Sequence, residues 1–166
     1  MAGALSLPFV IGDALHAAGA PVPHSLESDY GFMIGHWTCH VTQAGTPDSD
    51  VNVEYEWSYD KRILRENMRL GDKLIGEFLT TYDKGTDRFK GVGVGPWGYV
   101  VWENPGFQAG HASERGYMFD SAKMIPVSRS EFDRISDTHY VVHDFEPGKG
   151  SGGDSPTDTE NCIKVK

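Results

Sequence analysis

The 166-residue chain has two cysteines, no long apolar run and few basic residues. Cys39 and Cys162 are too few for the disulfide framework of a small secreted domain. No window holds 18 uninterrupted apolar residues, so we expect neither a membrane span nor a membrane partner. Lys and Arg number 15 against 24 Asp and Glu, a formal net charge of −9. An acidic surface repels phosphate backbones, so we expect no nucleic-acid partner.

Several catalytic and metal-binding motifs are also missing. The chain has no Gly-x-Ser-x-Gly elbow, no phosphate-binding loop and no CxxC, HExxH or His-x-His spacing. His36 and His40 share one strand face, as do His139 and His143, but positions i and i+4 on a strand lie about 13 Å apart. Neither pair can chelate one ion alone, so the spacing predicts no metal site.

Glycine and aromatic side chains are abundant instead. The chain holds 20 glycines, and 11% of its residues are aromatic, which favours strands and tight turns over a helical bundle. We divide the chain into an N-terminal segment, residues 1–24, which includes a loosely helical stretch at 3–18, and one folded domain, residues 25–166. The first 20 residues lack a basic start, and Asp13 and His16 interrupt their apolar part, so we expect a cytoplasmic protein.

The hydrophobic period changes along the folded domain. Ser25 is a suitable N-cap for a short helix that Gly35 can end. From His36 onward the period is two, most clearly at residues 51–59. The pattern predicts ten strands with hairpin-length connections, which indicates an all-β barrel or sandwich. The predicted strands are residues 36–43, 51–59, 62–70, 74–82, 87–93, 97–103, about 113–119, 122–130, 132–145 and 157–165.

One glycine-rich stretch within these strands needs its own interpretation. Gly91, Gly93 and Gly95 alternate, and no helix follows them, so they do not form a dinucleotide-binding fingerprint. We interpret them as a bend or a crowded corner of a barrel.

Four segments together carry a resemblance to a known superfamily. They are Gly35-His36-Trp37, the hairpins WSYDKRILRENM and TTYDKGTDRFKGVGV, and the final pair DTHYVVHDFE and TDTENCIKVK. In this order they resemble the lipocalin-like (calycin) superfamily, especially its small bacterial members of unassigned function. The resemblance implies a single up-and-down antiparallel barrel with an internal pocket and a packed floor around Trp37.

The nitrobindin-type haem proteins are related to that superfamily. Their first strand carries Gly-x-Trp-x-Gly-x-Gly, and here Cys39 and Val41 replace the later glycines, so we expect no haem and no other cofactor. First and last strands are neighbours in such a barrel, so Cys39 could meet Cys162. We favour two buried thiols over a disulfide.

Polar residues on otherwise apolar strand faces are the candidates for chemistry. Apolar walls push the pKa of a carboxyl or imidazole toward neutrality, which suits a general acid or base. We assign Glu66 or His139 as the base and Tyr99 or His111 as the hydrogen-bond donor. The structural alternative is a Glu paired with an Arg across the sheet. Candidate substrate-binding residues are Trp37, Tyr55, Trp57, Glu77, Trp102, Arg115, Tyr117 and His143.

These candidates support three functional hypotheses. The first is a cofactor-free enzyme that performs acid–base elimination, isomerisation or cyclisation on a small apolar or aromatic compound in the barrel. The second is a carrier of a small hydrophobic ligand without chemistry. The third is haem binding, with His139 or His143 as the axial ligand. A homodimer is a further expectation.

Overall fold

The computed structural model describes residues 23–120, 123–145 and 156–166, with the backbone alone at residue 120 and residues 123–128. The predicted helical stretch at residues 3–18, and most of the N-terminal segment, lie outside the described residues. Within them the chain is all-β apart from one short helical segment, and its strands close into a single barrel. The predicted fold class is therefore confirmed.

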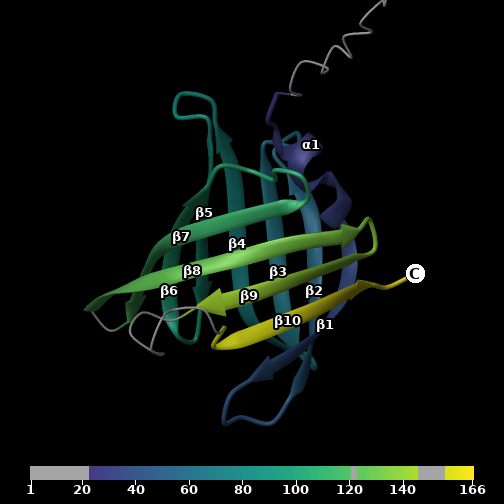
Figure 1. Cartoon of the computed structure of the whole chain (residues 1–166), viewed down its shortest axis with the longest axis vertical. Coiled ribbons are helices and arrows are strands. Elements are labelled where there is room, and N and C mark those ends of the chain that lie inside the picture. The colour runs from purple at the N-terminus through teal and green to yellow at the C-terminus, as the bar shows by residue number, and fades with distance from the viewer. Residues whose placement is uncertain (1–22, 121–122, 146–155) are drawn as a thin grey trace, which may run out of the picture.

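The short helix α1 (Leu26–Tyr30) covers one end of the barrel (Figure 1). Ser25 is its N-cap, as predicted, and the Ser25 side chain accepts a hydrogen bond from the backbone N–H of Ser28 at 3.0 Å. A 3-10 turn, η1 (Gly31–Met33), follows and leads into the first strand. Leu26, Tyr30 and Met33 are buried, so this segment plugs the barrel end. No helix in the described residues is long and apolar enough to cross a membrane.

Ten antiparallel strands form the barrel wall (Figure 1). Each strand pairs with the next in sequence, and the last pairs with the first, which removes any open sheet edge. The strands are β1 (Gly35–Gln43), β2 (Ser49–Ser58), β3 (Ile63–Leu70), β4 (Lys73–Asp83), β5 (Arg88–Gly95), β6 (Gly98–Asn104), β7 (His111–Asp120), β8 (Lys123–Ser136), β9 (His139–Phe145) and β10 (Asp158–Lys164).

The predicted division between the eighth and ninth strands was wrong. Predicted strands at 122–130 and 132–145 place the turn near residue 131, whereas β8 continues to Ser136 and the turn lies at Asp137 and Thr138. No glycine or proline marks this turn, so the sequence carries no strong signal for it.

The core lies at the helix-covered end, around Trp37. The Trp37 side chain is only 1% exposed, and its indole Nε1 donates a hydrogen bond to the carbonyl of Met33 at 2.5 Å. The ring of Tyr140 lies 4.8 Å from the Trp37 ring in an edge-on arrangement. The packed floor that the resemblance implied is therefore present.

Glycines on the inner face of β5 make room for large rings. A Cβ atom on Gly91 would lie 2.1 Å from the indole of Trp102, and one on Gly93 would lie 2.2 Å from the ring of Phe78. Any side chain at these positions would displace the rings. The alternating glycines thus lie on a crowded inner wall of the barrel; the predicted crowding is present, but on the inner face and not at a corner.

Candidate functional site

The barrel interior contains a cavity of about 160 Å³. A dry engineered cavity of about 150 Å³ holds a benzene molecule, so this space suits a ligand of roughly one ring. Residues from α1, η1 and eight of the strands line it: Tyr30, Met33, Tyr55, Leu64, Glu66, Met68, Phe78, Thr80, Val100, Trp102, Glu114, Arg115, Gly116, Ser130, Phe132, Val142, Asp144 and Glu160.

Flat aromatic side chains make up much of the cavity wall. Phe78 and Trp102 are held there by the glycines of β5, while Tyr55, Phe132 and Tyr30 contribute from other elements. Aromatic faces give a rigid apolar surface on which a ring or a cation can stack. The wall is therefore suited to an organic molecule.

Four carboxyl groups share this apolar wall: Glu66 on β3, Glu114 on β7, Asp144 on β9 and Glu160 on β10. We call them the interior acids. Glu114 is buried, and the other three keep some accessible surface because they line the cavity. Charged side chains are rarely placed inside a barrel unless paired, so this set is the main polar feature of the interior.

Burial raises the pKa of Glu66 from 4.5 to about 7. A hydrogen bond from the Tyr55 hydroxyl favours the carboxylate and opposes that shift. The Tyr55 and Tyr140 hydroxyls lie 3.0 Å apart, so the two phenols form a buried pair next to the carboxyl. With a pKa near 7, Glu66 can both accept and release a proton at neutral pH.

The pKa values of Glu114 and Glu160 are raised further than that of Glu66. Burial raises the pKa of Glu114 to about 8, against a hydrogen bond from Asn104, and nearby Glu66 and Asp144 add to the rise. Asn104 Nδ2 donates to Glu114 at 2.9 Å. Burial also raises the pKa of Glu160 to about 8, with further rises from the charges of Asp144 and Glu66. The interior acids thus repel one another through the cavity.

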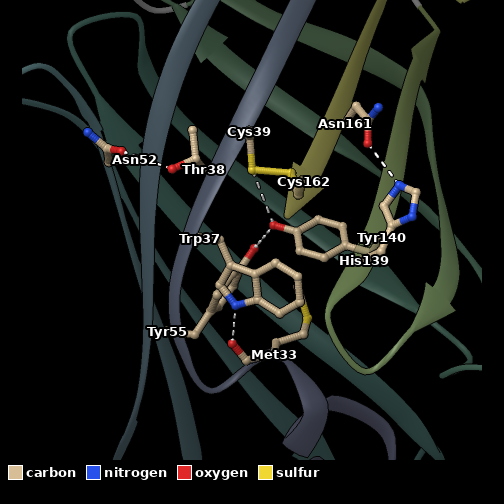
Figure 2. Close-up of a disulfide and its surroundings, with 10 residues drawn as sticks. All are labelled: Met33, Trp37, Thr38, Cys39, Asn52, Tyr55, His139, Tyr140, Asn161 and Cys162. Carbon is tan, nitrogen blue, oxygen red and sulfur yellow. Dashed lines mark hydrogen bonds between the residues drawn. A yellow bond between two sulfur atoms is a disulfide. The ribbon is translucent and has the colours of Figure 1, made fainter. Parts of the chain in front are cut away.

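A disulfide lies close to Glu160. Figure 2 shows this disulfide and the residues around it. Cys39 and Cys162 face each other on paired strands with their Cα atoms 3.9 Å apart, and their sulfurs are bonded. The favoured interpretation of two buried thiols was therefore wrong. The strand register places both side chains on the inner face at the same level, which the sequence alone did not reveal. The Tyr140 hydroxyl lies 3.6 Å from the Cys39 sulfur.

Of the four predicted catalytic residues, Glu66 lies in the cavity and the other three lie on the outside of the barrel. His139 points away from the interior and contacts Asn161 at 2.9 Å (Figure 2). Tyr99 is 44% exposed and stacks on Phe119. His111 is exposed and contacts Asp133 at 2.9 Å. None of these three can donate to or accept from a ligand inside the barrel.

The predicted binding residues divide in a similar way. Tyr55, Trp102 and Arg115 line the cavity. Arg115 is nevertheless exposed, because it sits in a β-bulge between two inward-facing positions, opposite Glu103 in the strand register. Trp37 and Trp57 face inward but pack in or against the core instead of lining the cavity.

The remaining three predicted binding residues lie on the outer face. Glu77 lies 3.8 Å from Arg65, the pairing across the sheet that the structural alternative described. Tyr117 is 46% exposed, and His143 contacts the Thr159 hydroxyl at 3.0 Å. Because His139 and His143 both point outward, neither can serve as an axial ligand for a haem inside the barrel.

Sequence reasoning missed three of the interior acids, namely Glu114, Asp144 and Glu160. Asp144 shares a strand face with Tyr140 and Val142, and Glu160 shares one with Cys162. The period-two pattern could therefore have found Asp144 and Glu160. The opposite faces of these strands are equally mixed, and the pattern did not say which face is inside. Only the strand register resolves this choice.

One further group of potential ligand atoms occurs in the described residues. Carboxylate and sulfur atoms of Cys39, Glu160 and Cys162 lie within 4.8 Å of one another. Both sulfurs are bonded to each other in the disulfide and are not thiolates, so they do not offer the ligands that a metal ion needs.

A comparison with protein-family models found no match for the chain, and a comparison with curated proteins found none either. The closed ten-stranded antiparallel barrel fits a lipocalin-like fold. The geometry of the cavity therefore carries the functional argument.

Proposed function

We propose that this protein binds one small organic molecule, of about the size of a single ring with a polar group, inside its barrel. The observation that supports this most directly is the cavity of about 160 Å³, whose wall combines aromatic rings with four carboxyl groups. A purely structural core would pack every one of these carboxyl groups against a donor or replace it with an apolar side chain, whereas Glu160 has no donor among the described residues.

A methyl-labelled sample and a panel of one-ring compounds test this proposal. Methyl groups of Met33, Met68 and Val100 line the cavity, whereas those of Val94 and Ile163 lie on the outer face. Binding in the barrel shifts the first set of NMR signals and leaves the second set unchanged. If every compound in the panel leaves the cavity methyl signals unchanged, the proposal is wrong.

A second candidate function is proton-transfer catalysis with Glu66 as the base. The arrangement that favours it is a buried carboxyl with a pKa of about 7 beside the Tyr55 and Tyr140 hydroxyls. Such a base can remove a proton from a carbon acid that the aromatic wall holds. This assignment keeps one of the four catalytic residues that the sequence predicted.

Ring opening of a monocyclic isoxazole that carries hydrogen at C3 tests this second candidate. A carboxylate removes the C3 proton, the electron pair of that C–H bond completes the nitrile, and the N–O bond breaks with its electron pair left on the enolate oxygen, so no cofactor is needed. We expect turnover that Glu66→Gln abolishes and that the outer-face control Glu54→Gln retains. Equal rates in wild type and Glu66→Gln would contradict this role for Glu66.

The predicted cytoplasmic location stays a prediction, and the disulfide bears on it. Disulfides persist mainly in oxidising compartments. The bond between Cys39 and Cys162 therefore favours an oxidising environment. Thiol alkylation followed by mass spectrometry of the protein in its source cells would show whether the two cysteines are bonded there.

A further inference from the structure

We propose that the occupant of the cavity is a small organic cation, a protonated amine carried on a ring-sized apolar frame, bound by the interior acids. This inference rests on the proposed function, because it names the chemical class of the molecule that the barrel binds. It depends on the sign of the charge around the cavity, on a carboxyl group without a partner, and on the spacing of the acids.

The cavity is lined by one sign of charge. Four of its lining residues are acids, and Arg115 is the one basic residue in the lining that the structure describes. The Arg115 side chain is exposed, and its charge is not among the causes that shift the pKa values of Glu66, Glu114 or Glu160. The interior therefore presents a net negative field to a ligand.

Glu160 supplies the second observation. It lies deep in the barrel and lines the cavity, and it has no hydrogen-bond partner among the residues that the structure describes. Glu66 and Glu114 each have a donor, namely Tyr55 and Asn104. A buried carboxyl group without a donor is costly, so a donor that arrives with the ligand would stabilise it most.

Asp144 is a further acid next to Glu160, and its charge adds to the rise in the pKa of Glu160. The Ser130 hydroxyl donates to Asp144, but a hydroxyl does not neutralise charge. An ammonium group in the cavity would provide Asp144 and Glu160 with both hydrogen bonds and the opposite charge.

The spacing of the acids favours an organic cation over a metal ion. The interior acids come from four different strands, and no three of their carboxylate groups converge within 4.8 Å in the part of the chain described here. A metal ion requires its ligands within about 2 to 2.6 Å. Acids spread around an aromatic-walled space of one ring instead suit a cation with an apolar body, since aromatic faces attract cations.

The pH response follows from the groups that face the cavity. With pKa values of about 7 to 8, Glu66, Glu114 and Glu160 are partly protonated at neutral pH when no ligand is bound. A bound ammonium group favours their ionised forms, so amine binding releases protons and strengthens as pH rises from 6 to 8.5. Other titratable groups that face the interior are Tyr30 from α1, Tyr55 from β2, Arg115 from β7, Tyr140 from β9, and Asp144 and Asp158 near the β9–β10 pairing.

These other groups do not reverse the expected rise in amine affinity with pH. Burial raises the pKa of Tyr30, Tyr55 and Tyr140 well above 10, so the phenols stay protonated in this range. On the described part of β8, Ser130 and Phe132 line the cavity and do not titrate in this range. Lys164 on β10 faces inward at the helix-covered end, where it donates to the carbonyl of Phe32 at 2.9 Å.

Three compounds of one shape and different charge test the proposal: benzylamine, benzyl alcohol and benzoate. Isothermal titration at pH 8 with the full-length protein measures each affinity, and methyl NMR confirms that binding occurs in the cavity. We expect benzylamine to bind about tenfold or more tighter than benzyl alcohol, and benzoate to bind most weakly. Glu160→Gln should remove most of the preference for the amine, while Glu54→Gln on the outer face should retain it.

The outcomes separate this inference from the proposed function. Equal affinities for benzylamine and benzyl alcohol, or amine binding that weakens between pH 6 and 8.5, would overturn the cation assignment and leave small-molecule binding standing. A preference that survives Glu160→Gln and Glu114→Gln together would also overturn it, because the acids would then not be its cause. No binding by any of the three compounds, in the cavity or elsewhere, would count against both proposals.

Discussion

Two buried polar regions of this barrel differ in how well their hydrogen bonds are satisfied. At the helix-covered end, Asp29 accepts hydrogen bonds from the backbone N–H of Phe107 at 3.0 Å and from the Ser28 hydroxyl at 2.8 Å, and it contacts His24 at 2.9 Å. Around the cavity, Glu160 has no such partner in the described residues. The first region has the pattern of a structural network, whereas the second contains the carboxyl group that we propose as a partner for a bound cation.

Asn104 shows where the two regions meet. It is fully buried, donates to the Tyr30 hydroxyl at 2.7 Å and to Glu114 at 2.9 Å, and accepts from the backbone N–H of Gly106 at 2.7 Å. Glu114 thus belongs to both regions, since it lines the cavity and is anchored to the structural network. Burial alone therefore does not distinguish a structural carboxyl group from a candidate site carboxyl group, whereas the lack of a hydrogen-bond donor among the described residues does.

The largest expected effect comes from the disulfide. Replacing Cys39 and Cys162 with alanine releases a cross-link between residues 123 positions apart and should lower the free energy of unfolding by about 2 to 5 kcal/mol. Urea unfolding of the variant and the wild type measures the difference. An unchanged unfolding midpoint would show that the barrel closes without the bond.

Asp29→Ala should have the next largest effect. It removes the acceptor for several donors, including the partly buried backbone N–H of Phe107, and should cost about 2 to 4 kcal/mol. Glu160→Gln, which removes a buried charge without a donor, should instead be neutral or stabilising at pH 8. Thermal unfolding of both variants compares the two regions directly. A large loss in Glu160→Gln at pH 8 would mean that Glu160 belongs to the structural network.

The pH dependence of stability should come from the interior acids. Their pKa values in the folded state lie above the ordinary value of 4.5, so ionisation is less favourable in the folded state than in the unfolded chain. Stability is therefore greatest below about pH 4.5 as far as these groups are concerned, and it declines as pH rises toward 8. The expected loss is about 2 kcal/mol or more for each fully ionised group.

Denaturant unfolding from pH 5 to 8.5 measures this decline. The double variant Glu114→Gln and Glu160→Gln should flatten the curve, while Glu54→Gln should keep its slope. A wild-type curve that rises across this range would contradict the assigned direction of the shifts.

The smallest effect concerns Tyr55→Phe. It removes the hydroxyl that favours ionised Glu66, so the pKa of Glu66 should rise further above 7. The loss of one buried hydroxyl pair with Tyr140 should cost about 1 kcal/mol in stability. Carbon-13 NMR titration of the Glu66 carboxyl measures the pKa. Tyr82→Phe, near the helix-covered end, serves as the control and should leave the Glu66 titration unchanged.

The strand count, the Ser25 cap and the Trp37 floor could all be predicted, because each depends on local sequence pattern or on the resemblance. The inward face of several strands could not. On β6, Tyr99 and Val101 alternate with Val100 and Trp102, so both faces look apolar. The glycines of β5 add to the ambiguity, because they occupy the inner face and leave Val92 and Val94 exposed outside.

The residues of the candidate site could likewise be predicted only in part, because the sequence does not show which strand face is inside. Glu66 was found because Leu64 and Met68 flank it on one face, and all three line the cavity. The sequence by itself thus determined the all-β fold, the helix start and one acid of the site, since hydrophobic period and capping act over a few residues. Tertiary structure alone decided that Cys39 bonds to Cys162 and that Glu66, Glu114, Asp144 and Glu160 share a cavity. These contacts join strands far apart in the chain, and only the register of a closed barrel sets which side chains face inward together.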